Sequence, residues 1–89
     1  MTTFKIMVFD CTDPTRGATE VEHPMPYYDL AGAQRRARIL VHEARGIGRR
    51  YRVSVHHLDE RGRVTHSQTL RRTGWGPPIE VRSRRKGQR

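Results

Sequence analysis

The sequence predicts a small α+β protein in which one amphipathic helix packs against one face of a small antiparallel sheet, in the order β-(β)-α-β-β. Three features point to this fold class: an alternating run of β-forming residues near the N-terminus, one long stretch of apolar residues at helical spacing, and a hairpin pattern after it. A chain of 89 residues is too short for two independent cores. We therefore expect a single domain over residues 1–81, followed by a flexible basic tail over residues 82–89.

The first two expected strands precede the helix. Residues 4–9 (FKIMVF) are rich in β-formers, and Ile6 and Val8 share one face because side chains alternate along a strand. This is the most apolar strand, so we place it in the centre of the sheet. A turn-rich stretch over residues 10–17 follows, and residues 19–23 are expected to return as a short polar strand at the edge.

The helix is expected over residues 30–45, with Asp29 as its N-cap after two prolines that interrupt the chain. Six apolar residues recur at helical spacing and form one stripe: Leu30, Ala33, Ala37, Leu40, Val41 and Ala44. We expect this stripe to be buried against the sheet. Gly46 is predicted to take the left-handed conformation that ends many helices, with Ile47 folding back onto the last turn.

Residues 51–58 and 63–71 form a predicted hairpin. Asp59 and Gly62 occupy the first and fourth positions of a type I turn, so we expect a positive φ at Gly62. The turn predicts three opposed pairs: Leu58 with Arg63, Val55 with His66, and Tyr51 with Leu70. The face that packs on the helix then carries Tyr51, Val53, Val55, Val64 and Leu70. Residues 79–81 are expected to add a short last strand.

The charge is strongly positive and unevenly distributed. The chain has 18 Lys and Arg residues against 9 Asp and Glu, for a formal net charge of +9. Residues 1–44 carry 5 basic and 6 acidic groups, a net −1, whereas residues 45–89 carry 13 basic and 3 acidic groups, a net +10. A domain this basic attracts polyanions, so nucleic acid is the partner that we favour.

Two segments supply the candidate nucleic-acid-binding surface. On the predicted helix, basic residues at 3-4-3 spacing fall within one narrow sector opposite the apolar stripe, and two arginines after the helix extend this ridge. The tail adds arginines suited to follow a phosphate backbone. The candidate contacts are Arg35, Arg38, His42, Arg45, Arg49, Arg50, Arg82, Arg84 and Arg85. The alternative is an ordinary solvated helix face and a solvated tail.

A second hypothesis is a protein-interaction module, such as a phage-encoded factor that acts on a host protein. Trp75, between two glycines and before two prolines, is its candidate interface residue. A lone Trp in a small protein more often covers an edge of the core, which is the alternative here. Because only 34% of the residues are hydrophobic, the core is thin, and a homodimer interface would supplement it.

The residue types that usually carry catalysis or bind metals form no recognisable pattern. Cys11 is the only cysteine, so the chain has neither an intrachain disulfide nor a thiolate metal cage. Of the five histidines, the predicted hairpin brings together only His57 and His66, without a third ligand. There is no glycine-rich phosphate loop, serine elbow or pair of carboxylates in a known spacing. We therefore expect a non-enzymatic protein with no cofactor and no metal.

The cellular location is also predicted from the sequence. No apolar run approaches the roughly 18 residues needed to cross a bilayer, so we expect no membrane partner. The N-terminus lacks the basic flank, long apolar stretch and cleavage site of a signal peptide. A single cysteine fits a reducing compartment, and the prediction is a cytoplasmic protein.

The helix followed by V-S-V-H-H-L-D-E-R-G-R-V, residues 53–64, resembles small proteins of actinobacteria and their phages that have no assigned activity. The resemblance covers about residues 28–64. It implies the same succession of helix, strand and hairpin. It assigns no functional residue.

Overall fold

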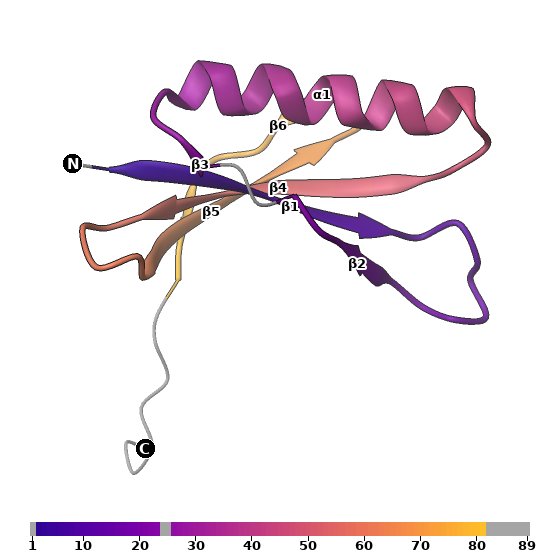
Figure 1. The fold of residues 1–89 in the computed structure, drawn as a ribbon, viewed down its shortest axis with the longest axis horizontal. Coiled ribbons are helices and arrows are strands. Elements are labelled where there is room, and N and C mark those ends of the chain that lie inside the picture. Colours follow the sequence, from indigo (N-terminus) through magenta and orange to yellow (C-terminus); the bar gives the residue numbers. More distant parts are fainter. Residues whose placement is uncertain (1, 24–25, 82–89) are drawn as a thin grey trace, which may run out of the picture.

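The structure, a computed structural model, describes residues 2–23 and 26–81 of the chain. Over these residues the chain forms one helix and a seven-stranded sheet (Figure 1). In chain order the elements are β1 (Thr3–Asp10), β2 (Thr19–Val21), β3 (Pro26–Tyr27), α1 (Leu30–Gly46), β4 (Tyr51–Leu58), β5 (Val64–Arg71), β6 (Gly74–Trp75) and β7 (Ile79–Glu80). The predicted tail, residues 82–89, lies outside the described residues.

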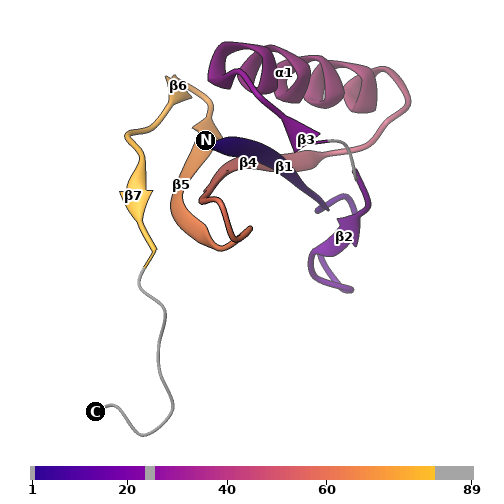
Figure 2. The same cartoon turned by 60° about the vertical axis from the view of Figure 1, so that its left-hand side comes forward.

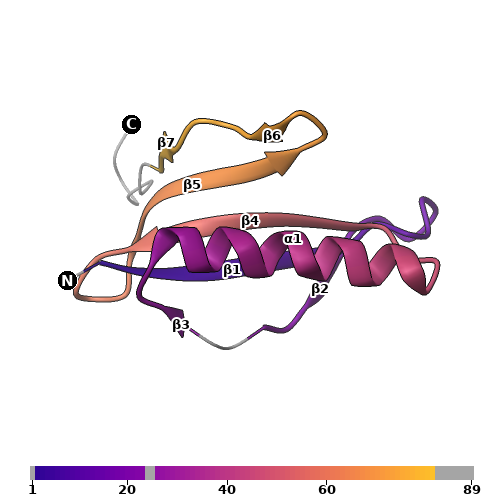
Figure 3. The same ribbon diagram turned by 90° about the horizontal axis from the view of Figure 1, so that it is seen from above.

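The strands pair antiparallel in the order β2-β1-β4-β5-β6, with β3 also pairing with β1 and β7 with β5. α1 lies across one face of this sheet, over β1 and β4 (Figures 1 and 3). Among the described residues no helix covers the opposite face. The predicted α+β fold, with one helix on an antiparallel sheet, is confirmed.

The core is built where β1 and β4 pair along their whole length, from Thr3 opposite Leu58 to Asp10 opposite Tyr51. The largest fully buried side chains all come from these two strands: Ile6, Val8, Val53 and Val55. All four are β-branched, a shape that packs well on a pleated surface. β1 therefore lies inside the sheet, as its apolar sequence predicts.

The helix approaches the sheet closely because its buried face is made of alanines. Ala33 and Ala37 are 0% exposed and Ala44 is 2% exposed. Short side chains at the contact let a helix pack nearer to its neighbour. The larger apolar residues flank this strip and are partly buried against the core: Leu30, Leu40 and Val41. The predicted stripe is confirmed, with alanines at its centre.

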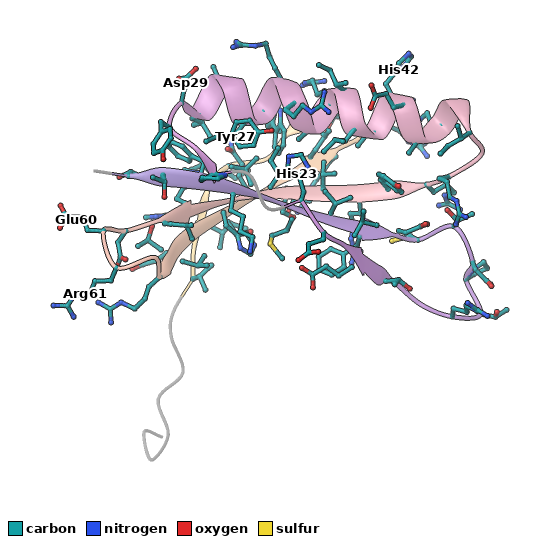
Figure 4. All side chains as sticks on the ribbon, in the orientation of Figure 1. His23, Tyr27, Asp29, His42, Glu60 and Arg61 are labelled. Atoms are coloured by element: carbon teal, nitrogen blue, oxygen red, sulfur yellow. The ribbon has the colours of Figure 1, made fainter. Side chains whose placement is uncertain are left out.

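The N-terminal cap of α1 agrees with the sequence, and the C-terminal cap does not. The Asp29 carboxylate accepts a 3.1 Å hydrogen bond from the backbone N–H of Gly32, and Figure 4 shows Asp29 at this end of the helix. At the other end, Gly46 is still helical, and Gly48 is the left-handed residue with φ +75. The prediction of a cap at Gly46 is therefore wrong.

The helix ends in a Schellman motif. The N–H of Arg49 donates to the carbonyl of Ala44 at 2.8 Å, and that of Gly48 to the carbonyl of Arg45 at 3.1 Å. Ile47 is 73% exposed and does not fold back onto the helix, contrary to the prediction. Glycines stand on both sides of Ile47, so local sequence does not discriminate between two stopping points. The later stop adds Gly46 to the helix, and Ala44 lies inside the helix with either stop.

The hairpin turn has a three-residue loop. The N–H of Asp59 donates to the carbonyl of Arg63, and the N–H of Gly62 to the carbonyl of Asp59, each at 2.9 Å. Gly62 has φ +80, as predicted. A type I turn followed by a left-handed glycine is a common way to join two strands through three residues. Leu58 consequently lies opposite Val64, and the prediction that it faces Arg63 is wrong.

A β-bulge shifts the hairpin by one more residue. His57 pairs with His66 although Leu58 pairs with Val64, so Thr65 is the extra residue on β5. Val55 therefore lies opposite Gln68 and not opposite His66.

The loop and the bulge each shift the pairing by one residue. After both shifts, the residues of β5 that follow the bulge point to the predicted faces of the sheet, but Val64, which precedes the bulge, does not. Ser54 pairs with Thr69, which places Leu70 opposite Val53 and not opposite Tyr51. Val64 precedes the bulge and shares its face with Leu58, away from the helix. The expectation that Val64 packs under the helix is therefore wrong.

Short strands complete the edges of the sheet. β2 confirms the predicted edge strand, and β7 confirms a short strand near residues 79–81, pairing Ile79 with Ser67. β3 and β6 have two residues each, too few to give an alternating pattern in the sequence. In Figure 2, β7 and the neighbouring part of β5 lie below the level of the helix, whereas β6 lies level with it.

Candidate functional site

A basic groove of about 600 Å³ lies beside the C-terminal half of α1. Three segments form it: the helix, the entry to β4 and the end of β5. Its basic lining residues are Arg38, His42, Arg45, Arg50, Arg71 and Arg72. Its apolar and aromatic lining residues are Val41, Tyr51, Val53 and Leu70. Within the described part of the chain, no Asp or Glu lines this groove.

The helix contributes three basic groove residues, which lie on one side of it because they recur about once per turn. Arg38, His42 and Arg45 are all exposed and lie along the flank of α1 nearest β5. The Nη2 atom of Arg38 lies 4.0 Å from the place that a Cβ atom on Gly74 would occupy, so this guanidinium extends as far as β6. His42 projects from the upper side of the helix in Figure 4. Three residues of the predicted ridge, Arg38, His42 and Arg45, thus form one wall of the groove.

The sheet contributes the other wall through the antiparallel pairing of β4 and β5. Pairing of this kind places the start of β4 next to the end of β5, so Arg50 lies near Arg71 and Arg72. The candidate contacts predicted on the helix, on its flanking arginines and on the tail do not include Arg71 and Arg72. The signal that identifies them is the hairpin itself, since the predicted pairing of Tyr51 with Leu70 already places residue 50 opposite residue 71.

A buried amide network fixes the helix relative to β5. Gln34 Nε2 donates to Gln68 Oε1 at 3.0 Å, and Gln68 Nε2 donates to the carbonyl of Gly76 at 2.7 Å. Gln68 is only 9% exposed, so these hydrogen bonds form in surroundings where an unsatisfied amide would be costly. The network holds the helix wall and the sheet wall of the groove in one arrangement.

The other predicted contacts lie away from the groove or outside the described residues. Arg35 is exposed further round the helix and does not line the groove. Arg49 binds Asp10 through a 3.1 Å ion pair. Hydrogen bonds from Thr12, followed by the charge of Arg49, hold the pKa of Asp10 below its ordinary value. Arg49 therefore has a carboxylate partner already. The remaining predicted contacts lie outside the described residues: Arg82, Arg84 and Arg85.

Trp75 lies at the edge of the core. It pairs with Leu70 across β5 and β6 and packs against the buried cluster beneath the helix. Its Nε1 atom is buried and has no hydrogen-bond partner within the described part of the protein. This packing agrees with the alternative given above, that a lone Trp covers an edge of the core. A contact between Trp75 and another protein stays a prediction.

Three of the histidines, His23, His57 and His66, lie close to another ring. His57 and His66 lie side by side with ring centroids 5.7 Å apart, and burial, followed by the charge of His66, lowers the pKa of His57. His23 and Tyr27 share a 3.0 Å hydrogen bond between Nε2 and the hydroxyl (Figure 4). Over residues 2–23 and 26–81, no group of three His, Cys, Asp or Glu side chains has an arrangement that would hold a metal ion.

Comparisons with protein-family models, curated proteins and solved structures give no match. The fold and the groove define the protein as a small α+β domain with a cluster of arginines where its helix meets the sheet. No helix in the described ranges is both long and apolar enough to span a membrane.

Proposed function

We propose that this protein is a non-enzymatic nucleic-acid-binding protein that contacts the phosphate backbone through the basic groove. The observation that carries the proposal is the convergence of five arginines and one histidine from three separate segments, with no carboxylate among the described residues that line the groove. A guanidinium group can donate two parallel hydrogen bonds to one phosphate, and it keeps its charge at any physiological pH. The net charge of +9 adds a long-range attraction for a polyanion.

The dimensions of the groove suit one strand of a nucleic acid. Arg38 and Arg45 stand seven residues apart, which is about 10 Å along a helix. The two guanidinium groups are therefore far enough apart to contact different phosphates of one strand. The Tyr51 and Leu70 side chains offer an apolar surface below the charges, where a sugar can rest. The arginines of the tail, residues 82–89, are proposed to extend the contact along the same backbone.

The salt dependence of binding tests the proposal. Fluorescence anisotropy with labelled single-stranded and duplex oligonucleotides, over a range of salt concentrations, gives the slope of log K against log salt. We expect the double variant Arg38→Ala/Arg45→Ala to flatten this slope by about 1.8 on duplex DNA and by about 1.4 on a single strand, because each lost phosphate contact contributes about 0.9 and about 0.7 respectively. Removal of residues 82–89 should flatten it further.

A matched control separates the groove from net charge. The double variant Arg35→Ala/Arg61→Ala removes the same charge from outside the groove, and Figure 4 shows Arg61 at the hairpin tip, away from the helix. We expect this control to change the slope by much less than the groove variant does. Equal losses in the two double variants, or no binding at low salt, would contradict the proposal. A host-protein complex that survives nuclease and moderate salt would favour the interaction module instead.

We also propose that the protein acts in the cytoplasm. The support is its single cysteine, Cys11, which is a free thiol in the structure. Fractionation of expressing cells, with a periplasmic or secreted marker as reference, tests the location.

A further inference from the structure

The sheet face opposite α1 presents side chains in ordered rows across the strands. Since Ile6, Val8, Val53 and Val55 point to the helix, the residues between them point to the other face. The pairing of β1, β4, β5 and β7 then gives three rows: Lys5, His56, Ser67 and Ile79; Met7, Ser54 and Thr69; and Phe9 with Arg52. No helix among the described residues covers these rows (Figure 1).

The chemistry of this open face suits unpaired bases. Phe9 is half-buried, so part of its ring is accessible for stacking, and Arg52 directly opposite supplies a cation. Ser54 and Thr69 hold their hydroxyls 3.4 Å apart and offer both donors and acceptors. Burial, followed by the charge of Lys5, lowers the pKa of His56, which leaves its ring neutral near pH 7 and able to donate and accept hydrogen bonds.

The open face and the basic groove meet at the same end of the sheet. Tyr51 lines the groove, and Arg52, the next residue of β4, points to the open face beside Phe9. Arg71 ends β5 at this edge and lines the groove as well. A strand that leaves the groove therefore has to pass round this end of the sheet to reach Phe9 on the other face. Glu20 on β2 pairs with Phe9 on the side away from Arg52. Its carboxylate repels a polyanion, so the proposed binding surface ends there.

We propose that the open sheet face binds the unpaired bases of a single-stranded nucleic acid whose backbone lies in the basic groove, with Phe9 as the stacking residue. This inference rests on the proposed function and adds the class of nucleic acid. A duplex keeps its bases stacked on one another and presents no free base plane to Phe9. In a single strand, nucleotides beyond the groove can place their bases on the open sheet face while the phosphates of their neighbours stay with the arginines.

The test compares two phenylalanines on the same strand and opposite faces. Phe9→Leu removes the ring from the open face, whereas Phe4→Leu removes a ring that packs against the core under the helix. Anisotropy titrations use a labelled single-stranded oligonucleotide and its duplex. The unaltered protein should prefer the single strand. Phe9→Leu should weaken single-strand binding about 5- to 150-fold, the range for loss of one stacked base, and leave duplex binding unchanged. Phe4→Leu should change neither.

The outcomes separate this inference from the proposed function. Equal affinity for single strand and duplex, or equal effects of Phe9→Leu and Phe4→Leu, overturns the role of the open face. If the groove variant still flattens the salt slope in that case, backbone binding stands without it. No binding at low salt overturns both. If a variant fails to fold, photocrosslinking of a 5-iodouracil oligonucleotide to the unaltered protein tests the inference without any substitution. The crosslink should lie within residues 6–16, the segment that contains Phe9. Crosslinks confined to other segments would overturn the inference.

Discussion

The two faces of the sheet differ in burial and composition although the same strands, β1 and β4, form both. On the covered face, Ile6, Val8, Val53 and Val55 are at most 2% exposed and meet the alanines of the helix. On the open face, the intervening residues of β1 and β4 are charged, hydroxylated, aromatic or thioether side chains that stay exposed or half-buried. Because successive residues of a strand alternate between faces, residues that stabilise the fold can be separated from residues that are free to bind.

The largest expected effect is a difference in stability between neighbours on β1. Ile6→Ala should lower the free energy of unfolding by about 2–5 kcal/mol, because it leaves a cavity in a thin core. Met7→Ala, on the open face, should cost less than about 1 kcal/mol. Urea denaturation of both variants measures the difference. A loss at Met7 as large as at Ile6 would mean that the open face is covered in solution, and a concentration-dependent midpoint would then identify the predicted homodimer.

A smaller effect is expected at the turn that determines which face Val64 joins. Gly62 has φ +80 and no atom within 4 Å of an added Cβ, so Gly62→Val introduces backbone strain without a clash. The cost should be about 1–2 kcal/mol of unfolding free energy. Gly46→Ala is the matched control, because Gly46 is helical and also has open space around it, and it should be neutral or stabilising. Chemical denaturation that ranks the two substitutions in the opposite order would contradict the turn geometry.

The smallest expected effect is a pH dependence that involves both faces. Burial is the main cause that lowers the pKa of His56 on the open face and of His57 on the covered face, and repulsion from Lys5 and His66 respectively adds to it. The unfolded chain therefore binds protons more tightly than the folded one. The stability that these groups contribute is complete above the unfolded pKa of about 6.5 and is lost as the pH falls through the folded values.

The thermal midpoint should therefore decrease when the pH is lowered from about 7.5 to 5. NMR titration of the imidazole protons in Lys5→Gln checks the cause, since this change should raise the pKa of His56 and leave that of His57 in place. A midpoint that stays constant or increases on acidification would contradict the direction of both shifts.

Residue patterns within single elements predicted the parts of the fold that depend on neighbours along the chain. Asp29 caps the helix, and the strand over residues 51–58 has the predicted bounds. The positive φ of Gly62 follows from a turn of a few residues. Each of these features depends on periodicity or on local hydrogen bonds, and both are visible in a short window of sequence.

The register of the hairpin was not predictable in this way. The three-residue loop and the bulge at Thr65 each shift the pairing by one residue, and a bulge is stabilised by its surroundings rather than by its own sequence. Here Thr65 Oγ1 donates to the carbonyl of His57 at 3.2 Å, and the N–H of Val81 donates to the carbonyl of Thr65 at 2.9 Å. These contacts join segments that are far apart in the sequence. Val64 precedes the bulge, so its wrong assignment comes from the three-residue loop.

The sequence by itself determined the charge, the helix with its apolar stripe and the alternation of the strands, because composition and periodicity are properties of the chain. The tertiary structure decided which arginines share a site. Arg38, Arg45 and Arg71 come together at the groove, whereas Arg49 is bound by Asp10 and Arg35 lies outside. Distances between side chains of different elements depend on how the helix crosses the sheet and on strand register, and both are set by packing between segments far apart in the sequence.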